Sequence, residues 1–374
     1  MINKKRLIGL TQKLISIDSQ NPGSTEAKIA GFVGDYLKRL GLRTKIYEFK
    51  NGRANLLAYL VSPRCKKTLL ITPHLDTVPA GRNWTLPPFA GKIHQARIYG
   101  LGATDCKCNL AVGMEVINSL VEDNVVLDYN LIFAATADEE TGSDYGLIPL
   151  INKNILKPDA AVVLDADEFE IIVAQKGLIH LKVKIFGKKA HGAYPWLGVN
   201  AISIAVDILK DLKGRKFVYR KNRYLRPPTM NIGTIKGGDK VNIVADWCEF
   251  ELDFRYLPGM SAKKMIKDLK KVVGRYANSY KIEISGMQKD YYIDRLHPLV
   301  KNFSAALKDS GIAPKICGSE GATTITFFQD KNIPAIATGF GTSGCAHTVD
   351  EYVKIDNLYK GSQVLEEFLK NYKF

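Results

Sequence analysis

The sequence from Thr68 to Val78, Thr-Leu-Leu-Ile-Thr-Pro-His-Leu-Asp-Thr-Val, joins a short apolar run to two chemically active side chains. The run Thr68–Thr72 has the length and composition of a buried strand in an α/β sheet. His74 and Asp76 follow it two residues apart, so both side chains point the same way at the strand end. The pair suits a metal ligand and the carboxylate that orients it. Taken alone, it fits a structural histidine equally well.

Two further apolar runs predict buried strands at Leu131–Ala135 and Ala160–Leu164. Each is followed by acidic residues. Before them, apolar residues at helical spacing over Ile29–Leu40 predict an amphipathic helix that ends at Gly41. This alternation predicts an α/β domain with polar groups collected at its strand ends.

From about Gly177 the pattern changes to strands with one buried face, because Leu181, Val183 and Ile185 alternate with lysines. The following segments predict a helix, two strands, a helix and a strand, at 201–212, 229–236, 247–256, 261–276 and 281–285. The resulting β-α-β-β-α-β order is that of a ferredoxin-like domain. We therefore expect a discontinuous domain of residues 1–175 and 288–374, interrupted by an inserted domain at 176–287.

Length and composition favour a two-domain protein without a membrane span, a secretion signal or a disulfide framework. The 374 residues suit two domains, and no apolar run approaches the ~20 residues of a membrane span. The N-terminus lacks the uninterrupted apolar core of a secretion signal. The six cysteines show no disulfide-framework spacing, which favours reduced thiols. We expect a cytoplasmic protein with no membrane partner.

The net charge is concentrated in the predicted insert. Residues 176–287 contain 23 basic and 9 acidic residues, a net +14 of the chain's +15. Such a field attracts anionic partners, although solubility alone would also explain it.

Acidic and histidine residues recur in four later motifs. These are Gly100-Leu-Gly-Ala-Thr-Asp105, Ala137-Asp-Glu139-Glu140-Thr-Gly142, Leu164-Asp165-Ala-Asp167-Glu168 and Gly344-Cys-Ala-His347-Thr-Val-Asp-Glu351. Together with His74 they supply two histidines and several carboxylates, the ligands that zinc prefers, and carboxylates can bridge two ions.

The ordered set resembles the co-catalytic zinc aminoacylase and carboxypeptidase family, which includes acetylornithine deacetylase, succinyl-diaminopimelate desuccinylase and glutamate carboxypeptidase. The resemblance covers essentially the whole chain. It is carried by His74-x-Asp76-Thr-Val-Pro79, Trp84 with Pro88-Phe89, Tyr99-Gly-x-Gly102-x-x-Asp105-x-Lys107, Glu139-Glu140-x-Gly142-Ser143, and Gly192 to Gly198 after His191. It implies a zinc-exopeptidase-like catalytic domain and an inserted ferredoxin-like domain for dimerisation or for covering the substrate.

The resemblance also implies a role for each matching residue. Asp105 would bridge two divalent ions, with zinc favoured and cobalt an alternative. His74 and Asp165 would complete one metal site, and Glu140 and His347 the other. Glu139 would be the catalytic base, and Asp76 would orient His74. Asp167 is a second candidate for the ligand position given to Asp165, which is preferred because it directly ends the apolar run.

The insert would contribute three further residues by the same resemblance. His191 and Asn242 would steady the developing oxyanion, reaching across a homodimer, and Arg255 would hold the substrate carboxylate. Cys106 and Cys108 depart from the family pattern. Since two cysteines cannot close a zinc site alone, buried structural thiols are favoured over ligands.

The leading function is hydrolysis of an N-acyl amide or peptide bond next to a carboxylate, of the acetylornithine deacetylase kind. Lys176-Gly177 lacks the paired arginines of desuccinylase relatives, which disfavours that substrate. Alternatives are a metallo-carboxypeptidase or dipeptidase, and a hydrolase that releases an amino acid from an acidic carrier protein. A different class is a catalytically dead module that binds nucleic acid or an acidic protein, suggested by seven basic residues around three aromatics in Lys213–Arg226. The intact ligand set argues against it.

Overall fold

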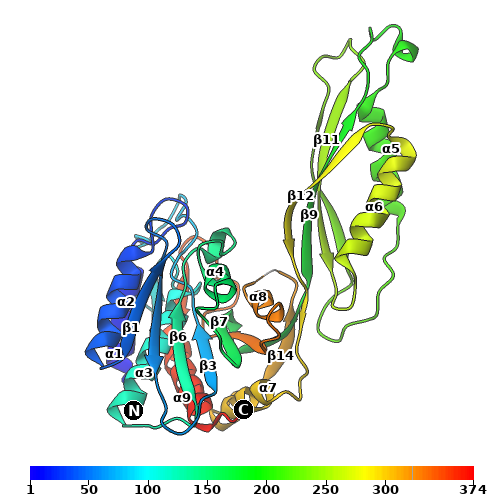
Figure 1. The fold of residues 1–374 in the computed structure, drawn as a ribbon. Helices are drawn as coiled ribbons and strands as arrows, with labels where there is room; N and C mark the ends of the chain where they lie inside the picture. Colours follow the sequence, from blue (N-terminus) through cyan, green and yellow to red (C-terminus); the bar gives the residue numbers. More distant parts are fainter. Residues whose placement is uncertain (322) are drawn as a thin grey trace. The chain divides into compact units, whose positions relative to one another are not determined.

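The strand predicted at Thr68–Thr72 forms as β3 and lies inside a nine-stranded sheet in the computed structural model, which describes residues 1–321 and 323–374. The sheet order is β1-β2-β6-β3-β7-β15-β8-β13, with β14 on β8. Figure 1 labels β1, β6, β3, β7 and β14 of this sheet. Strands β6, β3, β7 and β15 run parallel, and the outer pairs run antiparallel. The bounds are β1 Arg43–Glu48, β2 Ala54–Leu60, β6 Asn130–Ala135, β7 Ala160–Glu168, β8 Glu170–Gln175, β13 Tyr291–Tyr292, β14 Lys315–Ser319 and β15 Ala335–Gly339.

Helices pack on this sheet through their apolar sides. Helix α3, which follows the Asp105 motif, is buried along nearly its whole length, as expected for a helix enclosed by other elements. The helices are α1 Lys4–Ile15, α2 Ala27–Arg39, α3 Lys107–Glu122, α4 Leu147–Asn152, α7 Pro298–Asp309, α8 Thr326–Gln329 and α9 Ile355–Asn371. A small sheet of β16 Tyr352–Lys354, β5 Arg97–Tyr99 and β4 Lys92–His94 completes the region. No helix in the described ranges is long and apolar enough to span a membrane.

The predicted insert forms a separate four-stranded antiparallel sheet of order β10-β11-β9-β12. With α5 and α6 this is the ferredoxin-like order predicted for the segment. Its buried cluster includes Ile179, Ile208, Phe250 and Val273, which belong to β9, α5, β11 and α6. The bounds are β9 Gly177–Phe186, α5 Ala201–Gly214, β10 Thr229–Gly237, β11 Trp247–Tyr256, α6 Ala262–Tyr276 and β12 Tyr280–Gln288.

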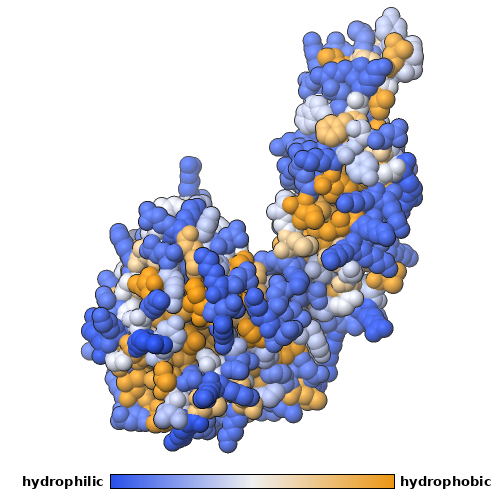
Figure 2. All heavy atoms as spheres, in the orientation of Figure 1, coloured by the Kyte–Doolittle hydropathy of each residue, from blue (hydrophilic) through white to orange (hydrophobic). Residues whose placement is uncertain are grey.

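The chain divides into two compact units. Unit 1 comprises residues 1–173, 293–318 and 323–374, and unit 2 comprises 174–292 and 319–322. The expected insert, 176–287, lies inside unit 2. In Figure 2 hydrophilic residues cover much of the visible surface, with apolar side chains gathered in patches between them.

One local detail differs from the sequence prediction. The strand expected at Ala160–Leu164 continues as β7 to Glu168, so Asp165 and Asp167 are strand residues. However, the regular pairing of β7 with β15 shifts after Leu164, because Thr338 pairs with Leu164 and Gly339 with Glu168. A Cβ on Gly339 would lie 1.8 Å from the carbonyl oxygen of Ala166, so only glycine fits beside this irregularity. Asp165 therefore sits where the ladder is interrupted.

Candidate metal centre

Five of the predicted ligands meet at the strand ends of unit 1. His74 Nε2 lies 2.9 Å from Asp105 Oδ1 and 3.8 Å from Asp165 Oδ1. His347 Nε2 lies 3.1 Å from Asp105 Oδ2 and 3.2 Å from Glu140 Oε2. Asp105 thus places one carboxylate oxygen against each histidine, which is the arrangement required of a group that bridges two ions.

The donor atoms form groups small enough to hold metal ions. One group is His74, Glu139 and Asp165, and another is Asp105, Glu140 and His347; in each, the candidate ligand atoms lie within 4.8 Å of one another. Histidine nitrogen and carboxylate oxygen suit zinc and similar divalent ions. Asp167 appears in none of the groups found in the described chain. The geometry therefore favours Asp165 over Asp167 as the candidate ligand.

The electrostatics of the cluster indicate an excess of negative charge. Burial raises the pKa of Asp165 to about 7, and the nearby Asp105 and Glu140 carboxylates act in the same direction. Burial, followed by repulsion from Asp165, raises the pKa of Glu139 well above its ordinary range. Within the described chain, no lysine or arginine forms an ion pair with these acids. Divalent cations would supply the missing positive charge, so the residues fit the metal ions that the sequence implies.

The pKa values of both histidines are raised as well, which favours their charged forms. Hydrogen bonds to Asp105 and Glu140 raise the pKa of His347 to about 10. Burial alone would lower the pKa of His74, but its contacts with Cys106, Asp105 and Asp76 outweigh burial and raise it. His347 is half-exposed and has a positive φ of 58°.

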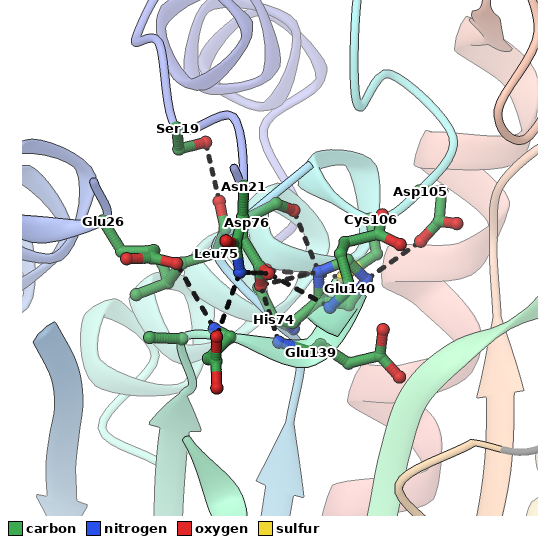
Figure 3. A network of polar contacts seen from close by, with 12 residues as sticks. Ser19, Asn21, Glu26, His74, Leu75, Asp76, Asp105, Cys106, Glu139 and Glu140 are labelled. Atoms are coloured by element: carbon green, nitrogen blue, oxygen red, sulfur yellow. Dashed lines mark hydrogen bonds and ion pairs between the residues drawn. The ribbon is translucent and has the colours of Figure 1, made fainter. Parts of the chain in front are cut away.

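Asp76 contacts His74 less directly than the sequence suggests. His74 Nδ1 is 3.0 Å from the backbone oxygen of Asp76 and 3.5 Å from its carboxylate. The carboxylate instead accepts the backbone N–H groups of Glu139 and Glu140, both at 3.1 Å (Figure 3). Asp76 therefore links the histidine to the turn that carries the predicted base and a predicted ligand.

Asn21 is a member of this network that the sequence motifs do not identify. Its side-chain amide donates to Asp76 at 3.0 Å, to Asp138 at 3.1 Å and to Thr141 at 3.0 Å. Figure 3 shows it beside Asp76, and only 3% of its surface is exposed. An asparagine before a proline reads locally as a turn residue, so no local signal points to this role.

Glu351 supports the opposite side of the cluster. Its buried carboxylate accepts the backbone N–H groups of Gly102 and Thr104 at 2.7 Å and that of Asp105 at 2.9 Å. These bonds fix the loop that presents Asp105. The peptide bond between Asp105 and Cys106 is cis.

The cysteines beside the cluster are buried and free. Cys106 Sγ lies near His74 and Asp105, but it accepts the backbone N–H of His74 at 3.2 Å and donates to that residue's carbonyl oxygen at 3.4 Å. Burial raises the pKa of Cys106 to about 12, whereas a metal ligand is a thiolate. These contacts support a structural thiol.

The three predicted residues of the insert lie in unit 2. His191 forms a β-bridge with Ile243, and Gly192 N–H donates to the Asn242 carbonyl oxygen at 2.8 Å, so His191 and Asn242 are neighbours. Asn242 precedes the start of β11 at Trp247, whereas Arg255 lies near the end of this strand. Arg255 pairs with Asp253 at 2.9 Å. From Trp247 to Arg255 the strand rises roughly 26 Å, at about 3.3 Å per residue. Unit 2 therefore separates Arg255 from the other two.

The chain is similar to known proteins along nearly its whole length. Peptidase family M20/M25/M40 matches residues 70–371. Acetylornithine deacetylase of Proteus mirabilis is 29% identical over 97% of this chain and 94% of its own length. Succinyl-diaminopimelate desuccinylase of Orientia tsutsugamushi is 26% identical over 96% and 94%. A tripeptidase structure from Staphylococcus aureus is 25% identical, with a TM-score of 0.81 over 99% of this chain and 98% of its own.

These matches span both units, including the inserted ferredoxin-like domain, and the family consists of dinuclear metal-dependent peptidases and amidohydrolases. The candidate centre of histidines, aspartates and glutamates in unit 1 is of the kind typical of that family. The chain is therefore a metallohydrolase that belongs to peptidase family M20/M25/M40.

Proposed function

We propose that the protein is a zinc-dependent amino-acid deacylase that cleaves an N-acyl amide next to a carboxylate, as an acetylornithine deacetylase does. The observation that carries the proposal is Asp105, whose two oxygens lie 2.9 Å and 3.1 Å from the nitrogens of His74 and His347. Two cations held there would polarise the scissile carbonyl and acidify the attacking water. Asp165 would complete the His74 site, and Glu140 the His347 site.

Glu139 acts as the general base in this proposal. Its carboxylate lies in the same group of donor atoms as His74 and Asp165, and its backbone N–H is held by Asp76. Glu139 takes a proton from the attacking water and returns it to the leaving amine. The raised pKa of Glu139 suits a group that must both accept and release a proton.

His191 and Asn242 donate to the developing oxyanion, and Arg255 binds the substrate carboxylate through its guanidinium. Because β11 rises roughly 26 Å from Trp247 to Arg255, and His191 and Asn242 lie on the Trp247 side of it, one copy of unit 2 cannot present all three to a small substrate. A second copy of the chain would supply His191 and Asn242.

An exposed apolar surface supports this homodimer. Ile202 and Val206 on α5 and Ile232 and Ile235 on the edge strand β10 are at least one-third exposed. An edge strand with apolar neighbours is suited to pairing with another copy of itself. We therefore place the dimer contact on β10 and α5.

The decisive experiment is a comparison of kcat/KM for the zinc- and cobalt-loaded protein. The substrates are N-acetylornithine, N-succinyl-diaminopimelate, dipeptides and amino acids linked to an acidic carrier protein. The proposal requires N-acetylornithine or a close N-acetyl amino acid to rank first. A higher rank for dipeptides would make the protein a carboxypeptidase or dipeptidase.

The net charge of +14 within residues 176–287 favours one second candidate, a hydrolase acting on an acidic carrier protein. A nucleic-acid module is disfavoured. Phe217 of the basic segment packs against Phe254 in the core of unit 2, with ring centroids 6.2 Å apart. Tyr224 packs against Leu225 and Leu257. Phe217 and Tyr224 are therefore not free platforms for bases. We place the enzyme in the cytoplasm, since the six cysteines are free.

A further inference from the structure

A groove in unit 2 lies between α6 and the segment 215–220 that follows α5. Its volume is about 760 Å³. Small-molecule sites occupy roughly 300–1,000 Å³, so the groove is large enough for a ligand of that class. All residues that line it belong to unit 2, and none is a predicted metal ligand or catalytic residue.

The apolar lining of the groove is rich in methionine. Met230, Met260 and Met265 line it together with Phe254 and Leu269. The chain has only six methionines, so half of them are gathered here. Methionine is unbranched, polarisable and adaptable, and proteins use it where an apolar surface must fit flexible partners. This lining suits an apolar chain better than a rigid polar substrate.

The rest of the lining is basic. Lys216, Arg220 and Lys264 are exposed, and within the described chain none of their side chains forms an ion pair. A fourth cation, Arg215, is bound by Asp211 at 2.8 Å. The acidic residue found in the lining is Asp268, so the unpaired cations outnumber it. Ser261, which lines the groove, caps the N-terminus of α6, so the positive end of this helix dipole also lies at the groove.

We propose that this groove binds an amphipathic anion, an unbranched apolar chain that ends in a carboxylate. The chain would lie along the three methionines, and the carboxylate would be held by Lys216, Arg220 and Lys264. Charge complementarity selects this occupant, because a neutral apolar molecule would leave the cations unused. A compact anion without a chain would leave the methionines unused. The site does not take part in hydrolysis, so it stands independently of the proposed substrate.

Binding in the groove can be measured through the NMR signals of its three methionines. In the full-length protein labelled with ¹³C at the methionine methyl groups, octanoate should shift the Met230, Met260 and Met265 signals in a saturable way. The Met114 and Met287 signals, from residues outside the groove, should stay in place. We expect 1-octanol to bind roughly tenfold more weakly, a modest factor because exposed ion pairs each contribute little. Acetate should produce no saturable shift.

Two variants sharpen the test. Lys216→Gln/Arg220→Gln leaves only Lys264 of the three cations, so it should reduce the preference for octanoate over octanol and leave the octanol shifts unchanged. The matched control is Lys267→Gln/Lys270→Gln, which removes two exposed charges of α6 outside the groove and should keep the preference. Unperturbed methionine signals in both unliganded variants report that the fold is retained. Equal binding of octanoate and octanol, or no saturable shift of the three groove signals, would overturn the proposal.

Discussion

The two units use charge in opposite ways. In unit 1 the carboxylates of Asp76, Asp105 and Glu351 are largely buried and fixed by backbone N–H groups or histidines. In unit 2 the charge is mostly basic and exposed, and cations such as Lys216 and Arg220 have no ion-pair partner in the described chain. Buried charges are costly to desolvate, so they need well-placed partners, and salt screens them little. Exposed charges act over a distance that salt shortens. The comparison predicts that changes at the buried charges of unit 1 lower activity strongly. Changes at the exposed charges of unit 2 should lower it less, and by an amount that depends on salt.

The largest effect should follow removal of metal. Chelation should abolish hydrolysis, because the acids of unit 1 then have no cation to position, and added zinc or cobalt should restore it. Elemental measurement should find up to two divalent ions per chain. Full activity in protein from which all metal has been removed, as verified by the elemental content, would contradict the mechanism.

The next effect concerns the predicted base. Glu139→Ala should lower kcat by about 10²–10⁴-fold, the usual contribution of a general base, and keep both metal ions. Glu140→Ala is the matched neighbour and should lose metal, since Glu140 contacts His347 at 3.2 Å. Metal content and kcat should be measured on both variants. If Glu139→Ala loses metal and Glu140→Ala keeps it, the two roles are reversed.

In unit 2, His191→Ala should lower kcat by about 10²–10³-fold with unchanged metal content, as for loss of an oxyanion donor. If His191 serves the partner subunit, mixing this variant with Glu139→Ala should regenerate some intact sites. Activity should be measured on heterodimers separated by two different tags. Absence of recovery there would place His191 in its own subunit's site or outside catalysis.

A substitution of Asn21 tests whether the buried network in unit 1 positions the turn that carries Glu139 and Glu140. Asn21→Ala removes three hydrogen bonds and should lower kcat by about 10–100-fold, the usual effect of groups that support a metal site. The control is Asn118→Ala, which removes a buried asparagine bonded to Tyr36 away from the cluster. Both variants should lower the melting temperature, but only Asn21→Ala should lower kcat. A similar kcat loss in both would mean a purely structural role.

The smallest effect should come from the exposed charge of unit 2. For a carrier-linked substrate, kcat/KM should fall as salt rises, because salt shortens the ~8 Å physiological Debye length. The value of kcat/KM for this substrate should also fall when five basic residues are neutralised: Lys213, Arg215, Lys216, Arg220 and Lys221. A free acyl-amino acid serves as the control and should respond little. If both substrates are indifferent to salt and neutralisation, the basic surface has no carrier role.

The sequence by itself determined the main elements of both units. Strands β3 and β11 form with the predicted bounds, because strand and helix periodicities are local properties of side-chain order. The same holds for the candidate ligands, since His74 and Asp105 belong to motifs that can be recognised along the chain. The continuation of β7 to Glu168 was missed because Glu168 pairs with Gly339, which lies far away in sequence.

Only the tertiary structure decided how the candidate centre is supported. Asn21 and Asp76 are 55 residues apart, and Glu351 and Gly102 are 249 apart, so no local pattern connects them. Each of these bonds satisfies a buried polar group that must find a partner wherever the folded chain provides one. The groove of unit 2 is likewise assembled from α5, β10, β11 and α6. Local sequence therefore determined which residues could react, whereas burial and long-range pairing decided which residues hold them in place.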